Sequence, residues 1–241
     1  MTTQTNTRTA GIRWFWFSSP ATFYPLAGTI AWIAGVLAAV LTVAGLYVGF
    51  VVAPTDATQG EAYRIIYIHV AAAWMSMFLY VVMAFWSAVG LAMNARLAFI
   101  LARAIAPTGA LFTFIALWTG SLWGKPTWGT WWVWDARLTS ELILLFLYFG
   151  YLALQASIDE RRRSDRAGAL LAVVGVVNVP IIYYSVQWWN TLHQGASVSL
   201  TKAPSMAKVM LLGMLLMALA FWMYSIAVVM IRARCEIRES Q

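Results

Sequence analysis

The sequence predicts an all-α polytopic membrane protein whose six transmembrane helices form one bundle. Of its 241 residues, 62% are hydrophobic and only 10% are charged, and the mean hydropathy is +0.73. A soluble domain cannot bury that much apolar surface, so the composition indicates a chain that lies in a membrane. Six apolar segments and an unequal distribution of basic residues support this class. We expect a single domain over residues 1–241.

Each of the six segments is long enough to cross a hydrocarbon core of about 30 Å at about 1.5 Å per helical residue. An aromatic run, Trp14 to Phe17, precedes the first segment and suits a membrane–water interface. The length of that segment indicates a retained span rather than a cleaved signal. Gly45 and Gly49 favour a close helix contact, and Pro107 and Pro180 are expected to kink the third and fifth spans. The predicted spans are 25–50, 68–93, 98–121, 138–157, 167–187 and 206–231, with ends uncertain by several residues.

The basic residues that flank these spans fall mainly on one side. Because basic loops stay in the cytoplasm, both termini are predicted to be cytoplasmic, and the run from Asp159 to Arg166 is predicted to be a cytoplasmic turn rather than a nucleic-acid site. The cytoplasmic set is Arg8, Arg13, Arg96, Arg103, Arg161, Arg162, Arg163, Arg166, Arg232, Arg234 and Arg238. The outer set is Arg64, Lys125, Arg137, Lys202 and Lys208.

The second outer connection carries a tryptophan-rich stretch from Trp123 to Asp135. Three outer connections are predicted, at 51–67, 122–137 and 188–205. Six tryptophans lie between Trp118 and Trp134, together with glycines and a proline. An interfacial aromatic belt explains one or two tryptophans per helix end. The excess favours an aromatic platform that receives a large flat cofactor at the outer face.

Both histidines of the chain, His69 and His193, fall on the same outer side. A lone histidine in a membrane protein is more often a hydrogen-bonded structural residue than a ligand. Two histidines beside a tryptophan cluster favour another reading, because neutral imidazoles can bind the two faces of a haem iron. Basic side chains on the outer side can pair with the haem propionates. These candidates are Arg64, Lys125, Arg137 and Lys202.

Asp135 closes the tryptophan-rich stretch, and three roles are open to it. It can cap the helix that follows, orient a histidine, or pair with a basic neighbour. Capping is favoured, and a local ion pair is expected between Arg137 and Glu141, which are four residues apart.

Other chemistries find little support in the sequence. Cys235 is the only cysteine, so no disulfide or cysteine cluster forms within the chain. The sequence has no phosphate-binding loop and no hydrolase motif. Acidic residues are nearly absent from span centres, which weakens proton-coupled transport. We predict no catalytic residue.

The run Trp-Gly-Thr-Trp-Trp-Val-Trp-Asp at 128–135 resembles the signature of the WWD-domain haem-handling superfamily. Its continuation at 136–142, Ala-Arg-Leu-Thr-Ser-Glu-Leu, is similar to that of the haem exporter protein C family (CcmC) of cytochrome c maturation. The resemblance covers nearly the whole chain: the length, six spans, cytoplasmic termini, and one histidine in each outer connection beside the signature.

The resemblance implies a haem-binding subunit in the bacterial inner membrane, with haem b held at the periplasmic face. It implies presentation of haem to the chaperone CcmE, which becomes covalently attached to it. It also implies an ABC-type complex with CcmA, CcmB and CcmD, in which CcmA would hydrolyse ATP. The implied iron ligands are His69 and His193, and the implied cofactor-binding residues are Trp123, Trp128, Gly129, Trp131, Trp132, Trp134 and Asp135.

Two other functions stay open at the level of the sequence. One is a permease that moves haem or a small solute, for which Thr113, Asn178 and Gln187 offer a sparse polar path. The other is a bis-histidine b-type electron-transfer cytochrome. That function is disfavoured because such cytochromes normally place histidines within spans and often bind more than one haem.

Overall fold

The computed structural model describes residues 19–239 except 194, 196–197 and 199–203, and these residues form a bundle of long helices. Six helical segments are long and apolar enough to cross a membrane, which confirms the predicted fold class. No β-strand occurs in the described part of the chain. The predicted anchor Trp14 to Phe17 and the candidate Lys202 lie outside the described residues. The elements are α1 Pro20–Tyr47, the π-helix η2 Val48–Val52, the 3-10 helix η3 Glu61–Ile65, α2 Ile66–Met93, α3 Arg96–Trp128, α4 Ala136–Ser157, α5 Arg161–Gly175, α6 Asn178–Trp188 and α7 Lys208–Glu239.

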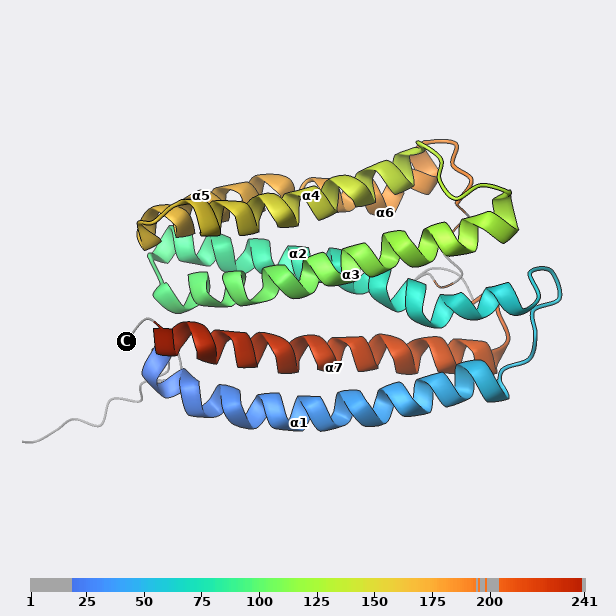
Figure 1. The fold of residues 1–241 in the computed structure, drawn as a ribbon, viewed down its shortest axis with the longest axis horizontal. Helices are drawn as coiled ribbons and strands as arrows, with labels where there is room; N and C mark the ends of the chain where they lie inside the picture. The colour runs from blue at the N-terminus through green and yellow to red at the C-terminus, as the bar shows by residue number, and fades with distance from the viewer. Residues whose placement is uncertain (1–18, 194, 196–197, 199–203, 240–241) are drawn as a thin grey trace, which may run out of the picture.

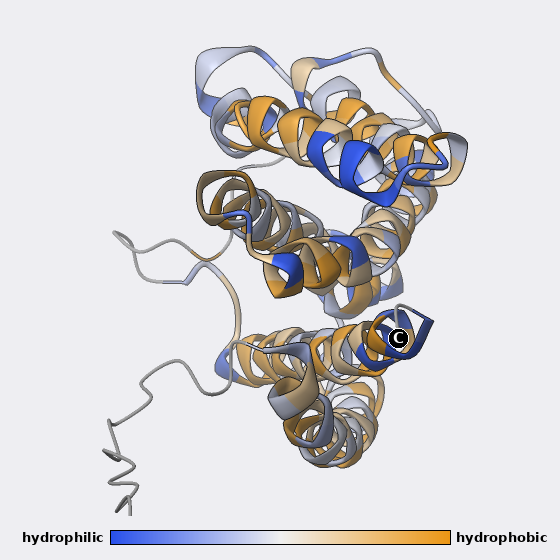
Figure 2. Cartoon of the chain, turned by 90° about the vertical axis from the view of Figure 1, so that its left-hand side faces the viewer, coloured by the Kyte–Doolittle hydropathy of each residue, from blue (hydrophilic) through white to orange (hydrophobic). Residues whose placement is uncertain are grey.

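The helices are arranged in three layers (Figures 1 and 2). α1 packs beside α7, α2 beside α3, and α4 beside α5 and α6. Both described ends of the chain lie at the same end of the bundle, where hydrophilic residues gather at the helix ends (Figure 2). The connections 53–60 and 129–135, and the described residues between α6 and α7, lie at the opposite end (Figure 1). We call these the terminal end and the loop end.

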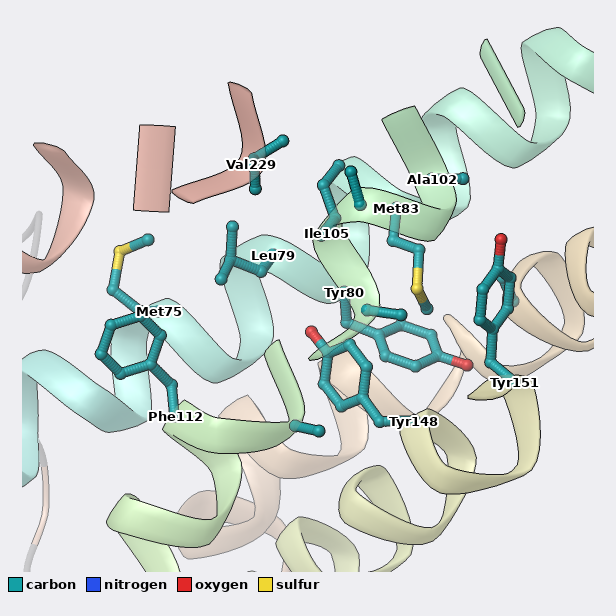
Figure 3. Packing of buried hydrophobic residues seen from close by; sticks show 14 of the residues in the cluster. Met75, Leu79, Tyr80, Met83, Ala102, Ile105, Phe112, Tyr148, Tyr151 and Val229 are labelled. Carbon is teal, nitrogen blue, oxygen red and sulfur yellow. The ribbon is translucent and has the colours of Figure 1, made fainter. Parts of the chain in front are cut away.

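A core of apolar and tyrosine side chains, with members from α2, α3, α4 and α7, joins the three layers (Figure 3). The rings of Tyr80 and Tyr148 meet edge to face with centroids 5.0 Å apart. Tyr148 donates a hydrogen bond of 2.8 Å to the backbone oxygen of Ser76, so its buried hydroxyl is satisfied. Two glycines let helices approach closely at the loop end: a Cβ at Gly45 of α1 would meet Met217 of α7, and one at Gly49 of η2 would meet Tyr67 of α2. The predicted glycine contact is therefore made within the chain.

At the terminal end, an ionic cluster around the buried Arg103 connects three helices. Arg103 of α3 pairs with Asp165 of α5 and, at 2.7 Å, with Glu236 of α7; Glu236 also accepts from Arg161. Since a broken buried pair leaves an uncompensated charge, this cluster fixes how the layers meet. The predicted turn is also shorter than expected, because α5 already begins at Arg161.

Two spans differ from the prediction in ways that affect the loop end. α3 continues to Trp128, seven residues beyond the predicted end at 121, so the connection to α4 is only 129–135. The fifth span is broken between Gly175 and Asn178, just before Pro180, into α5 and α6. Pro107, by contrast, lies within an unbroken α3.

Candidate functional site

A cavity of about 480 Å³ lies at the loop end, between α2, α3 and α4. Its volume is in the range of small-molecule and cofactor sites. Residues outside the long helices also line it: Thr58, Gln59 and Ala62 from the segment before α2, and Leu192 and His193 from the connection after α6. Its lining residues are Thr58, Gln59, Ala62, His69, Ala73, Ala116, Leu117, Gly120, Trp123, Pro126, Thr127, Trp128, Arg137, Leu138, Glu141, Leu192 and His193.

His69 lies one turn into α2, and its ring is held by α3. Its Nδ1 is 3.0 Å from Thr119 Oγ1, and that hydroxyl is 2.6 Å from the backbone oxygen of Ile115. A hydroxyl has one hydrogen, and the Ile115 carbonyl can only accept. Thr119 therefore donates to Ile115 and accepts from His69 Nδ1–H. This tautomer leaves the lone pair on Nε2 for a metal.

Gly120, one residue further along α3, makes room for this ring. A Cβ built at Gly120 would lie 3.0 Å from His69 Cε1. That distance is tighter than an ordinary van der Waals contact, so a side chain here would displace the imidazole. Thr119 and Gly120 together set the position of His69.

His193 reaches the same cavity from the 189–207 connection. Its ring centroid is 6.3 Å from that of His69, with an angle of 36° between the planes. Two metal–nitrogen bonds of about 2 Å each, together with the half-widths of the two rings, span about 6 Å. The separation thus fits two imidazoles on opposite sides of one metal ion.

The surroundings of the two histidines restrict what such a metal can be. No group of three or more His, Cys, Asp or Glu residues in the described part of the chain is arranged to hold a metal. A metal whose other coordination positions are filled by its own ligand, such as the iron of a porphyrin, needs only two nitrogens from a protein.

The first half of the tryptophan-rich stretch is helical and lines the cavity. Trp123 is only 9% exposed, meets His69 edge to face at 5.6 Å, and donates from Nε1 to Gln59 Oε1 at 2.7 Å. Trp128, the last residue of α3, lies with its ring centroid 6.2 Å from that of His193. One tryptophan therefore accompanies each histidine.

The second half of the stretch turns away from the cavity. Gly129 has a φ of +78°, which glycine adopts without strain, and it ends α3 with its N–H bonded to Lys125 O. Trp131 and Trp134 are 52% and 77% exposed, and half-buried Trp132 packs edge to face on Trp134. Of the predicted cofactor-binding residues, the lining excludes Gly129, Trp131, Trp132, Trp134 and Asp135.

Asp135 caps α4, as its position in the sequence indicates. Its carboxylate accepts from the backbone N–H of Leu138 at 2.8 Å. Thr119, a residue that the sequence did not single out, takes the role of orienting a histidine. Thr119 is fifty residues after His69 in the sequence, and no local motif indicates that it contacts this histidine.

The basic residues that were predicted to pair with haem propionates lie in different places in the structure. Arg64 is bonded to the carbonyls of Gly49 and Ala53, at 2.7 and 3.1 Å, and to Glu61, so it closes the end of the π-helix η2. Lys125 bonds to Gly129 O outside the cavity. Of the three described candidates, Arg137 alone lines the cavity.

The prediction of an ion pair between Arg137 and Glu141 is wrong. Among the described residues, no ion pair joins these two side chains. Arg137 donates to the backbone oxygen of Ile182 at 2.7 Å, and Glu141 meets Ser76 of α2 at 2.7 Å. Contacts with neighbouring helices replace the local pair.

The comparisons with known proteins all point to one family, and its model covers nearly the whole chain. The family model described as "Heme exporter protein C" matches residues 13–241. The "Heme exporter protein C" of Escherichia coli K12 is 55% identical over 179 residues, which are 74% of this chain and 73% of that protein. The proteins of the same name from Haemophilus influenzae and Bradyrhizobium diazoefficiens are 44% and 46% identical, over 93% and 91% of this chain and 92% and 83% of their own lengths. This chain therefore belongs to the heme exporter protein C family.

Proposed function

We propose that this chain holds haem at the loop end of the bundle, with His69 and His193 as its axial ligands. The separation of the two imidazole rings, 6.3 Å between centroids across one cavity, is the observation that carries the proposal. The relatives' name, heme exporter protein C, supports haem handling in cytochrome c maturation. When bound, haem supplies an iron with two open axial positions and two carboxylate groups.

The chain's own residues then have distinct roles in this binding. Thr119 keeps His69 in the tautomer that offers Nε2. Trp123 and Trp128 supply apolar surface and exclude water beside the two rings. Arg137, on the cavity wall, is the cation placed to meet a haem carboxylate. The cargo would be haem b, bound without a covalent link to this chain.

The proposal extends to location and partners. The distribution of arginines supports a cytoplasmic terminal end, and with it a haem site that faces the periplasm of the inner membrane. From that face the chain presents haem to the chaperone CcmE. It works in an ABC-type complex with CcmA, CcmB and CcmD, and ATP hydrolysis belongs to CcmA. The absence of a phosphate-binding loop in the sequence supports this division of labour.

Absorption spectra of the purified protein test the ligand assignment. The wild-type protein is expected to show a low-spin, six-coordinate haem. His69→Gly and His193→Gly are each expected to lose most of this signal, because one axial nitrogen is gone. Added imidazole should restore the low-spin spectrum if the histidine acts as a ligand, since free imidazole can occupy the vacated space.

A matched substitution separates ligand loss from damage to the loop. Trp189→Ala changes an exposed residue of the same connection that does not line the cavity, and it is expected to leave the low-spin spectrum in place. If the double histidine variant keeps a wild-type spectrum, the assignment of His69 and His193 is wrong.

A further inference from the structure

The inner end of the cavity contains polar groups that the axial-ligand arrangement does not use. Glu141 of α4 lines the cavity and reaches Ser76 of α2. Ser76 is seven residues beyond His69 in the same helix, which places it about 10 Å deeper at about 1.5 Å per residue. Arg137 lies one helical turn before Glu141 on the same face of α4 and lines the same cavity. The cavity thus extends inward from the histidines to a carboxyl group and a guanidinium.

The hydrogen-bond geometry around Ser76 indicates that Glu141 carries a proton. The Ser76 hydroxyl lies 2.8 Å from the backbone oxygen of Ala73 and 2.7 Å from Glu141 Oε1. Its single hydrogen can serve only one of these two acceptors. Both contacts become hydrogen bonds when a protonated Glu141 donates to Ser76 and Ser76 donates to Ala73. A neutral carboxyl also suits a residue that is 5% exposed and has no ion-pair partner among the described residues.

The second oxygen of this carboxyl group is available to a ligand. Glu141 Oε2 is buried and has no hydrogen-bond partner in the described part of the chain. A buried polar atom left without a partner costs free energy, and such atoms in native structures call for an explanation. Because Glu141 lines the cavity, a molecule bound there can supply the missing partner.

The charges at the inner end select the kind of partner. Arg137 is cationic, so with a neutral Glu141 the pair carries a net charge of about +1 and repels a cation. A carboxylate is attracted by the guanidinium and can accept a hydrogen bond from a neutral carboxyl group. Placing the Glu141 hydrogen on Oε2 directs it to such a ligand, and the Ser76 hydroxyl then donates to Oε1. No proton enters or leaves the site in this exchange.

We propose that Glu141 is a ligand-binding residue, which donates a hydrogen bond to a carboxylate of the bound molecule beside Arg137. This inference rests on the proposed function, because haem carries two carboxylates. The proposal assigns a neutral carboxyl group to the binding of a carboxylate. Charge complementarity alone would have assigned that binding only to basic residues. The proposal also gives the inner end of the cavity a chemical preference that is independent of iron ligation.

Two porphyrins distinguish this role from a general effect on cavity shape. The purified full-length protein is titrated with haem and with the dimethyl ester of haem, which keeps the iron and lacks free carboxylates. Glu141→Leu is expected to weaken haem binding by about tenfold or more, as for a lost hydrogen bond to a charged group. Its loss of affinity for the ester should be clearly smaller, because an ester carbonyl accepts only a neutral hydrogen bond, which is about half as strong as one to a carboxylate. Glu141→Gln keeps a donor, so its haem affinity should stay within about threefold.

Thr113→Val is the matched control, because Thr113 is fully buried in α3 but bonds within its own helix and does not line the cavity. It should change neither affinity. An equal loss for both porphyrins in Glu141→Leu, or no loss for either, overturns the proposal. A wild-type protein that binds neither porphyrin contradicts the proposed function and the role of Glu141 together. Histidine-dependent haem binding with an unchanged Glu141→Leu affinity contradicts the role of Glu141 alone.

Discussion

The two halves of the tryptophan-rich stretch have the same residue type and opposite surroundings. Trp123 and Trp128 belong to α3, line the cavity and each approach a histidine. Trp131 and Trp134 follow the end of the helix and are mostly exposed. The comparison shows that a cluster of tryptophans in a sequence does not define one surface. The point where the helix ends decides which members line the cavity.

The change of surroundings has a local cause at Gly129. Up to Trp128, the helical period places Gly120, Trp123 and Thr127 on one face, toward α2 and the cavity. The left-handed conformation of Gly129 ends the helix. The chain then returns along α3, where Ser121 Oγ donates to Trp131 O at 2.8 Å. The exposed tryptophans are thus tied through their backbone to the helix that lines the site.

The largest effect is expected from Trp123→Ala, in the helical half. This change removes the edge contact with His69, the contact with Tyr63 and the hydrogen bond to Gln59. Truncating a buried tryptophan costs about 3 kcal/mol or more of unfolding free energy. We expect a lower thermal midpoint in detergent and the loss of most bound haem. Trp123→Phe, which keeps an aromatic ring of smaller size and loses the N–H donor, should retain more of both than the alanine variant. A wild-type haem content in Trp123→Ala would show that the helical half does not form the site.

An intermediate effect is expected from Thr119→Val, which keeps the side-chain shape and removes the acceptor for His69 Nδ1–H. Loss of a group that orients a metal-ligating histidine typically lowers affinity by about 10- to 100-fold. Haem titration followed by absorption should show this loss with little change in thermal midpoint. Thr119→Ser keeps the hydroxyl and is the matched control. Equal affinities in the valine and serine variants would mean that the Thr119 hydroxyl does not set the tautomer.

These residues also show how much of the fold and of the candidate site can be predicted from the sequence. The six spans follow from hydropathy and length, and the two histidines and the tryptophans are visible as residue types. Thr119 and Ser76 are ordinary helix residues in the sequence, and they become important only because α2, α3 and α4 pack together. The spacing of Arg137 and Glu141 predicts a local ion pair, but Glu141 instead contacts α2 and Arg137 contacts α6. Gly124 and Pro126 are typical of a loop, but α3 continues through both and carries Trp128 to the cavity.

The smallest effect on haem binding is expected in the exposed half, from Trp131→Ala and Trp134→Ala. Surface substitutions change free energies by about 0.5 kcal/mol or less, so haem affinity should change by no more than about twofold. If the chain presents haem to the chaperone, as we propose, this transfer should fall clearly in the double variant, because exposed tryptophans are typical anchors for a partner protein. The measurement is haem-loaded chaperone formed in cells, at matched levels of the membrane protein. Phe146→Ala on α4, exposed and away from the cavity lining, is the control and should leave transfer unchanged. A double variant that loses haem itself would place both halves at the ligand, whereas undiminished loading of the chaperone would leave the exposed half with no part in delivery.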